Sequence, residues 1–114
     1  MVHAIYSGKA AGHINTVKDD YLISVNPELS IDVFSRSEQR KIKIINIALM
    51  RCSLVVEDLL FIGTEESNLH MLDAVSLEEY DHHQVRQSVF SICNLDEETV
   101  IVGQHKGFIE VFQV

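Results

Sequence analysis

The feature that most constrains this chain is a pattern that recurs three times along it. Each copy has an apolar opening, a polar turn and an apolar-x-apolar-apolar ending, and equivalent residues lie 38 and then 40 positions apart, as at Ile31, Leu69 and Ile109. The copies are LISVNPELSIDVFS at Leu22–Ser35, LFIGTEESNLHMLD at Leu60–Asp73 and VIVGQHKGFIEVFQ at Val100–Gln113. A unit repeated at such a period hides its apolar side against its neighbours, so the copies are expected to stack on one another.

Each copy is predicted to be a β-hairpin, because β-branched and aromatic residues flank a polar turn. Pro27 suits the first turn through its fixed φ, and Gly107 falls where a turn needs a positive φ. Further strands are expected before each hairpin and after the first two. These strands are Ile14–Lys18, Cys52–Val56 and Phe90–Leu95 before the hairpins, and Lys41–Asn46 and Glu78–His82 after them.

One segment, Ile44–Val56, is apolar enough to form a buried helix instead. It has no N-cap residue, however, and it follows the clean alternation of Lys41–Asn46, which is typical of a strand. We therefore expect strand here and keep the helix as the alternative.

A unit of about 40 residues with four short antiparallel strands has the size of one β-propeller blade. The hairpins resemble WD repeats, which end an alternating apolar strand in a Trp-Asp pair. The matching pairs here are Phe34-Ser35, Leu72-Asp73 and Phe112-Gln113, the family's small hairpin residue is matched by Ser24, Gly63 and Gly103, and its Gly-His pair by Gly12-His13. The resemblance implies a scaffold that holds protein or peptide partners on its rim loops, without catalysis.

The expected fold is therefore all-β, with three four-stranded antiparallel blades in a single domain of residues 1–114. The repeats span residues 13–46, 52–83 and 90–114, and Val2–Ser7 is a further strand-like run. Propellers have roughly 4–8 blades, so three do not close a ring. Two copies joined head to tail would give about six blades, with Val2–Ser7 of each finishing the other's third blade, and this would leave no exposed sheet edge. Completion by a different propeller-forming chain, or a piece of a longer propeller, stays open beside the homodimer.

The composition restricts the class of partner. Asp and Glu number 17 against 9 Lys and Arg, a net charge of −8, so nucleic acid is not expected as a partner. No apolar run reaches the roughly 20 residues that a bilayer-spanning helix needs, and no signal peptide is expected at the N-terminus. Cys52 and Cys93 stand among apolar residues and are predicted to be buried free thiols, which favours a cytoplasmic protein.

The sequence contains no recognisable catalytic or metal-binding motif. The six histidines are not spaced as metal ligands, and the adjacent His82 and His83 would point to opposite faces of a strand. Neither cysteine has a nearby histidine, and no Gly-rich phosphate loop occurs. We expect no enzyme and no cofactor; a six-bladed hydrolase with a metal in its central channel is the alternative from the enzyme class.

The candidate site is the rim formed by the loops at one end of the strands. Its residues are Lys9, Glu28, Arg51, Glu65, Glu66, His82, His83, Arg86, His105 and Lys106. The acidic turns Lys18-Asp19-Asp20, Glu57-Asp58 and Asp96-Glu97-Glu98 would gather at the opposite end. An acidic or phosphorylated peptide is expected to prefer the first end, and a basic segment the second.

Overall fold

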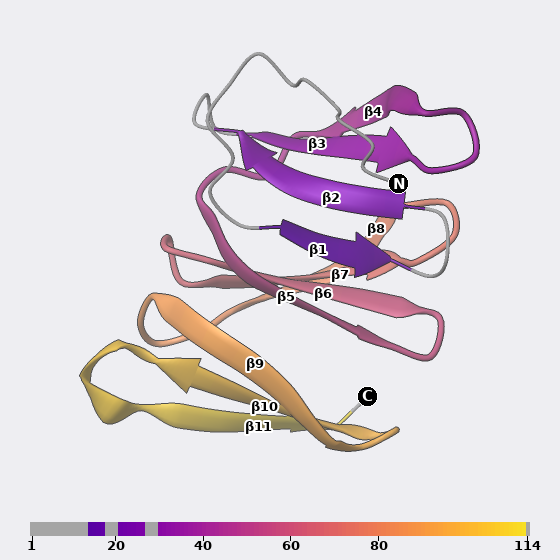
Figure 1. Ribbon diagram of the computed structural model, residues 1–114. Coiled ribbons are helices and arrows are strands. Elements are labelled where there is room, and N and C mark those ends of the chain that lie inside the picture. The colour runs from indigo at the N-terminus through magenta and orange to yellow at the C-terminus, as the bar shows by residue number, and fades with distance from the viewer. Residues whose placement is uncertain (1–13, 18–20, 27–29, 114) are drawn as a thin grey trace. The chain divides into compact units, whose positions relative to one another are not determined.

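A computed structural model describes residues 14–17, 21–26 and 30–113 of the chain, and Figure 1 shows their strands. The packing of the chain divides it into two compact units, residues 1–48 and 49–114. The predicted strand Val2–Ser7, the Gly12-His13 pair, the rim residues Lys9 and Glu28, and the turns at Lys18-Asp19-Asp20 and Pro27 lie outside the described residues.

The first unit holds one antiparallel sheet in the order β1-β2-β3-β4, which we call the first blade. Its strands are β1 (Ile14–Val17), β2 (Tyr21–Asn26), β3 (Ser30–Ser35) and β4 (Arg40–Ile45). Neighbouring strands follow each other in sequence, and β3 pairs with both β2 and β4. The turn between β3 and β4 closes because the amide of Gln39, at φ 54°, donates to the carbonyl of Ser35 at 2.8 Å.

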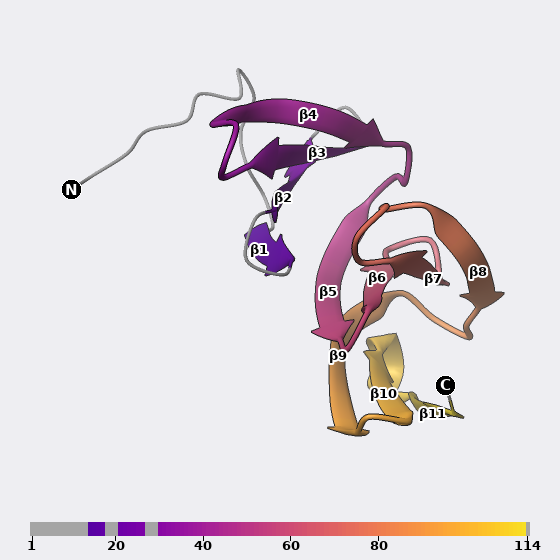
Figure 2. The same ribbon diagram turned by 90° about the vertical axis from the view of Figure 1, so that its right-hand side faces the viewer.

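The second unit holds two sheets, the middle blade with order β5-β6-β7-β8 and the last blade with order β11-β10-β9. The middle strands are β5 (Met50–Val56), β6 (Leu59–Thr64), β7 (Asn68–Asp73) and β8 (Glu79–Gln84). The last strands are β9 (Val89–Asp96), β10 (Thr99–Gln104) and β11 (Ile109–Gln113), and the 3-10 turn η1 (His105–Gly107) joins the latter two. Strand β9 packs beside β5 (Figure 2), so the two sheets meet face to face.

The core of this unit forms where the middle and last blades meet. Alternate residues of β5, β6, β7 and β10 point into it, as expected for half-buried strands. Its fully or nearly buried members are Cys52, Val56, Phe61, Leu69, Val85, Val89, Val100 and Val102. Most are β-branched or large apolar residues, which suit a pleated surface covered on one side.

The all-β prediction is confirmed, and the helix alternative for Ile44–Val56 is wrong because that segment ends β4 and forms β5. Predicted strand ends differ from the observed ones by one or two residues, as at β5, which begins at Met50. Gly107 has φ 81°, as the turn requires. Nothing helical in residues 14–17, 21–26 and 30–113 has the length and apolar character that crossing a membrane demands.

The prediction that both cysteines are buried is right for Cys52 and wrong for Cys93, which is exposed. Cys93 pairs in register with Ile101 on the side of the last blade that turns away from the core. Apolar neighbours in sequence could not show this, because both sides of that sheet are apolar.

The two thiols are expected to differ sharply in reactivity. Burial raises the pKa of Cys52 to about 11, so in the folded chain it stays a thiol at neutral pH. In a dilute solution of single chains, a disulfide reagent at about pH 8 should label one thiol per folded chain rapidly, and the second only when urea unfolds the protein. Because the folded pKa of Cys52 lies above its ordinary 9.0, its contribution to stability is intact below about pH 9 and is lost as the pH rises through about 11. Cys93→Ala should remove the rapid phase; rapid labelling of two thiols would contradict the burial of Cys52.

Candidate functional site

Three of the predicted rim residues lie around an exposed aromatic ring. The guanidinium of Arg51, on β5, lies 4.8 Å from the ring centroid of Phe90, on β9. The same guanidinium bonds a carboxylate oxygen of Glu65, in the turn after β6, at 2.8 Å. The ring of His105 stands edge-on to Phe90 with the centroids 5.5 Å apart. A cation over a ring face is attracted by the ring's quadrupole, so Arg51 is held by both a charge and a π-system.

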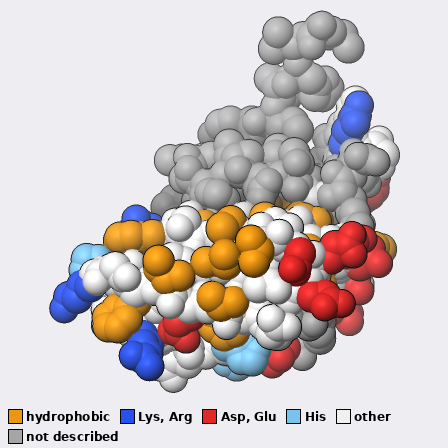
Figure 3. Space-filling view, turned by 90° about the horizontal axis from the view of Figure 1, so that it is seen from below, with side chains coloured by type: hydrophobic (Ala, Val, Ile, Leu, Met, Phe, Trp, Pro, Cys, Tyr) orange, Lys and Arg blue, Asp and Glu red, His pale blue; other side chains and the backbone are white. Residues whose placement is uncertain are grey.

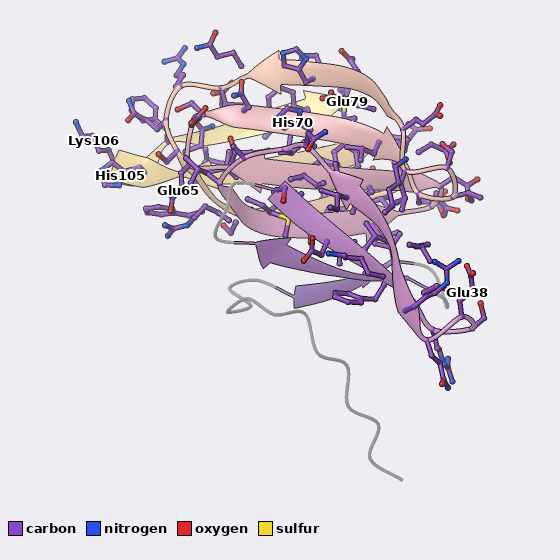
Figure 4. All side chains as sticks on the ribbon, turned by 90° about the horizontal axis from the view of Figure 1, so that it is seen from above. Glu38, Glu65, His70, Glu79, His105 and Lys106 are labelled. Carbon is purple, nitrogen blue, oxygen red and sulfur yellow. The ribbon has the colours of Figure 1, made fainter. Side chains whose placement is uncertain are left out.

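Two hydrogen bonds to backbone carbonyls fix this arrangement. The hydroxyl of Ser88 donates to the carbonyl of Glu65 at 2.5 Å, and the amide of His105 donates to the carbonyl of Ser88 at 2.9 Å. The loop before β9 is thereby tied both to the β6–β7 turn and to η1. Figure 4 shows Glu65, His105 and Lys106 at the same end of the strands.

A second arginine–aromatic pair continues the surface. The guanidinium of Arg86 lies 5.7 Å from the ring centroid of Phe108, the residue that follows η1. Glu110 accepts from the Arg86 amide at 3.2 Å and from the side-chain amide of Gln104 at 3.1 Å. We call the connected residues the rim patch: Arg51, Arg86, Phe90, His105, Lys106 and Phe108.

The opposite end of the second unit is acidic. The turns there are Glu57-Asp58 between β5 and β6, and Glu97-Glu98 between β9 and β10, beside Asp96. The pKa of Glu97 is raised, chiefly by its hydrogen bond with the Glu57 carboxyl and then by the negative charge of Glu57. Seen from the side of the last blade, basic and acidic side chains gather at opposite ends with hydrophobic ones between them (Figure 3).

The structure brings together five predicted rim residues, Arg51, Glu65, Arg86, His105 and Lys106, and leaves Glu66 exposed beside Glu65 in the β6–β7 turn. The prediction missed Phe90 and Phe108, which are 47% and 38% exposed. No local signal pairs them with Arg51 and Arg86, which lie 39 and 22 residues away in sequence.

His82 and His83, the other predicted rim residues that the structure describes, lie within strand β8 and not in a loop. They point to opposite faces, as adjacent strand residues do. His82 stacks on His70 at 5.5 Å between ring centroids, and His83 lies 5.5 Å from the Phe112 ring. His70 also bonds Glu79 through Nδ1 (Figure 4). Across the described part of the chain, no three His, Cys, Asp or Glu side chains converge to hold a metal ion.

A second surface is the outward side of the last blade, which we call the open face. Cys93, Ile101 and Val111 lie side by side across its three strands, and Ile109 follows along β11. Ile109 is 69% exposed and Val111 61%, whereas the repeat-equivalent Leu69 of the middle blade is fully buried. Strand β11 is also the edge of its sheet, whereas the equivalent β7 pairs with β8.

The chain is similar to solved β-propellers. No protein-family model matches it, and no curated protein matches it. It superposes on the β-propeller domain of Cps50 (Swd1) from Myceliophteria thermophila with a TM-score of 0.81 and 9% identity, covering 100% of this chain and 38% of that one. For the WD40 repeats of RRP9 the TM-score is 0.78 at 16% identity, covering 89% of this chain and 34% of the other.

A third similar structure is hydrazine synthase from Kuenenia stuttgartiensis, with a TM-score of 0.79, 16% identity, and coverage of 99% of this chain and 35% of that one. This chain thus spans about a third of each of these structures. Identities this low establish the fold and leave the function open. The described strands, their order and these similarities show that the chain has the fold of β-propeller blades.

Proposed function

We propose that this chain is a non-catalytic protein-interaction module of the cytoplasm, a propeller segment whose last blade is covered by a second copy of the chain. The observation that carries the proposal is the contrast between equivalent residues of two blades. Leu69 and Phe61 are 0% and 1% exposed beneath the last blade, whereas Ile109, the counterpart of Leu69, is 69% exposed. The open face thus repeats a pattern that this chain elsewhere covers with another blade.

Two copies would supply about six blades, within the range of closed rings, and ring closure removes free sheet edges. A different propeller-forming chain could cover the same face, and light scattering combined with affinity capture separates the two partners. The hydrolase with a metal in its channel remains the alternative function. Metal analysis of the purified chain tests it, since such an enzyme would retain a stoichiometric ion.

Val111→Lys is expected to abolish self-association. Light scattering at micromolar concentration should give twice the mass of one chain for the parent protein and a single-copy mass for Val111→Lys, because a lysine in an apolar interface must be desolvated without a partner. Val75→Lys is the matched control, since Val75 is as exposed as Val111, at 61%, but lies in the turn after β7. A single-copy mass for the parent protein would contradict the two-copy ring.

A further inference from the structure

We propose that the rim patch binds an Asp/Glu-rich segment of a partner protein. The inference rests on the proposed interaction function, but it concerns a different surface from the open face. It follows from the unpaired cations, the exposed rings and the charge distribution of the second unit.

Two cations of the patch have no carboxylate partner among the described residues. Arg86 contacts the Phe108 ring through its guanidinium, while Glu110 bonds only its backbone amide. Lys106 is exposed at the tip of η1, where its φ of 62° and the 81° of Gly107 shape a tight turn. Arg51, in contrast, already has Glu65 as its partner. Arg86 and Lys106 are therefore the groups available to an incoming anion.

The two aromatic rings make these cations more effective. Phe90 and Phe108 remain 47% and 38% exposed although each is approached by a guanidinium. Rigid rings offer contact area at little cost in conformational entropy, and an arginine resting on a ring is held in place before a ligand arrives. The surface therefore fits a segment in which carboxylates alternate with apolar side chains.

The arginines of the patch are not arranged for a phosphate group, and the acidic turns of the second unit direct an acidic segment to the rim. Arg51 and Arg86 rest on different rings, and Arg51 is occupied by Glu65, so no pair of guanidinium groups is arranged to clamp one phosphate dianion. The acidic turns at Glu57-Asp58 and Asp96-Glu97-Glu98 repel an acidic segment from the far end and so orient it toward the rim.

The test is fluorescence anisotropy of a labelled peptide in which glutamate alternates with leucine, titrated with the full chain. Binding should weaken as salt rises and should be lost when glutamine replaces glutamate in the peptide. Arg86→Gln and Lys106→Gln are each expected to weaken binding by about 2–10-fold, as for rim charge contacts of up to about 1.4 kcal/mol. Arg36→Gln, the same change in the exposed turn after β3, should alter it less than about twofold.

Circular dichroism of each variant shows that it is folded. Equal binding of the glutamine peptide, or equal affinity of the Arg86→Gln and Arg36→Gln variants, would overturn the proposal, as would tighter binding of a phosphoserine peptide than of the glutamate peptide. Val111→Lys separates the two proposals. Its peptide binding should be unchanged even where its self-association is lost, and a chain that is always single-copy can still bind the peptide.

Discussion

Leu69→Ala should lower the free energy of unfolding by about 2–5 kcal/mol, whereas Ile109→Ala, at the equivalent position of the next repeat, should change it by less than about 0.5 kcal/mol. Leu69 is fully buried in the core between the middle and last blades, so truncation leaves a cavity lined by residues such as Phe61. Ile109 is 69% exposed on the open face, where water fills the vacated space.

Urea unfolding followed by circular dichroism measures both changes. The titration should be run at two chain concentrations. Association through the open face would make the urea midpoint of the unsubstituted protein depend on chain concentration. At the lower concentration the two substitutions should differ as stated. Similar losses for both would mean that Ile109 is covered within a single chain, and the open face would then not exist.

The repeat made the strands and their pairing predictable, because a strand's alternation and a turn's chemistry are local properties. Gly107 illustrates this, since its positive φ follows from its place between two apolar runs. Asp73, matched to the WD pair, also has a local role: its carboxylate accepts from the amides of Val75 and Ser76 at 2.8 and 2.9 Å and closes the turn to β8.

Exposure and side-chain grouping could not be predicted in the same way. Cys93 and Ile109 carry the pattern of buried strand residues, yet what covers a sheet face is decided by a neighbouring blade. Phe90 and Phe108 were absent from the predicted rim because their strands read as ordinary apolar runs. Their partners Arg51 and Arg86 lie 39 and 22 residues away from them in sequence, so only the tertiary fold brings each pair together.

Gly63→Ala should destabilise the fold by about 1–3 kcal/mol, because the added methyl group overpacks the contact between blades. A Cβ at Gly63 would lie 2.4 Å from Cγ1 and 2.9 Å from Cβ of Val89, and 3.0 Å from the Cys52 sulfur. Val89 is fully buried, and its stiff β-branched side chain cannot rotate away. The sheets must therefore separate locally, which also costs neighbouring contacts in the core.

Gly103→Ala is the matched control, since Gly103 is the repeat equivalent of Gly63. A Cβ there would approach Ser91 Oγ at 2.6 Å, but the next nearest atom, the Ser91 carbonyl oxygen, is 3.8 Å away, so rotation of one hydroxyl relieves the contact. Losing a glycine also reduces the freedom of the unfolded chain, so this substitution should be neutral or stabilising by up to about 1 kcal/mol. Opposite signs for the two changes, from the urea titration at the lower chain concentration, would show that this glycine is required in β6, where a blade packs upon it, and dispensable in β10, where the face of the single chain is open. Equal losses at that concentration would instead place a blade of the same chain over Gly103.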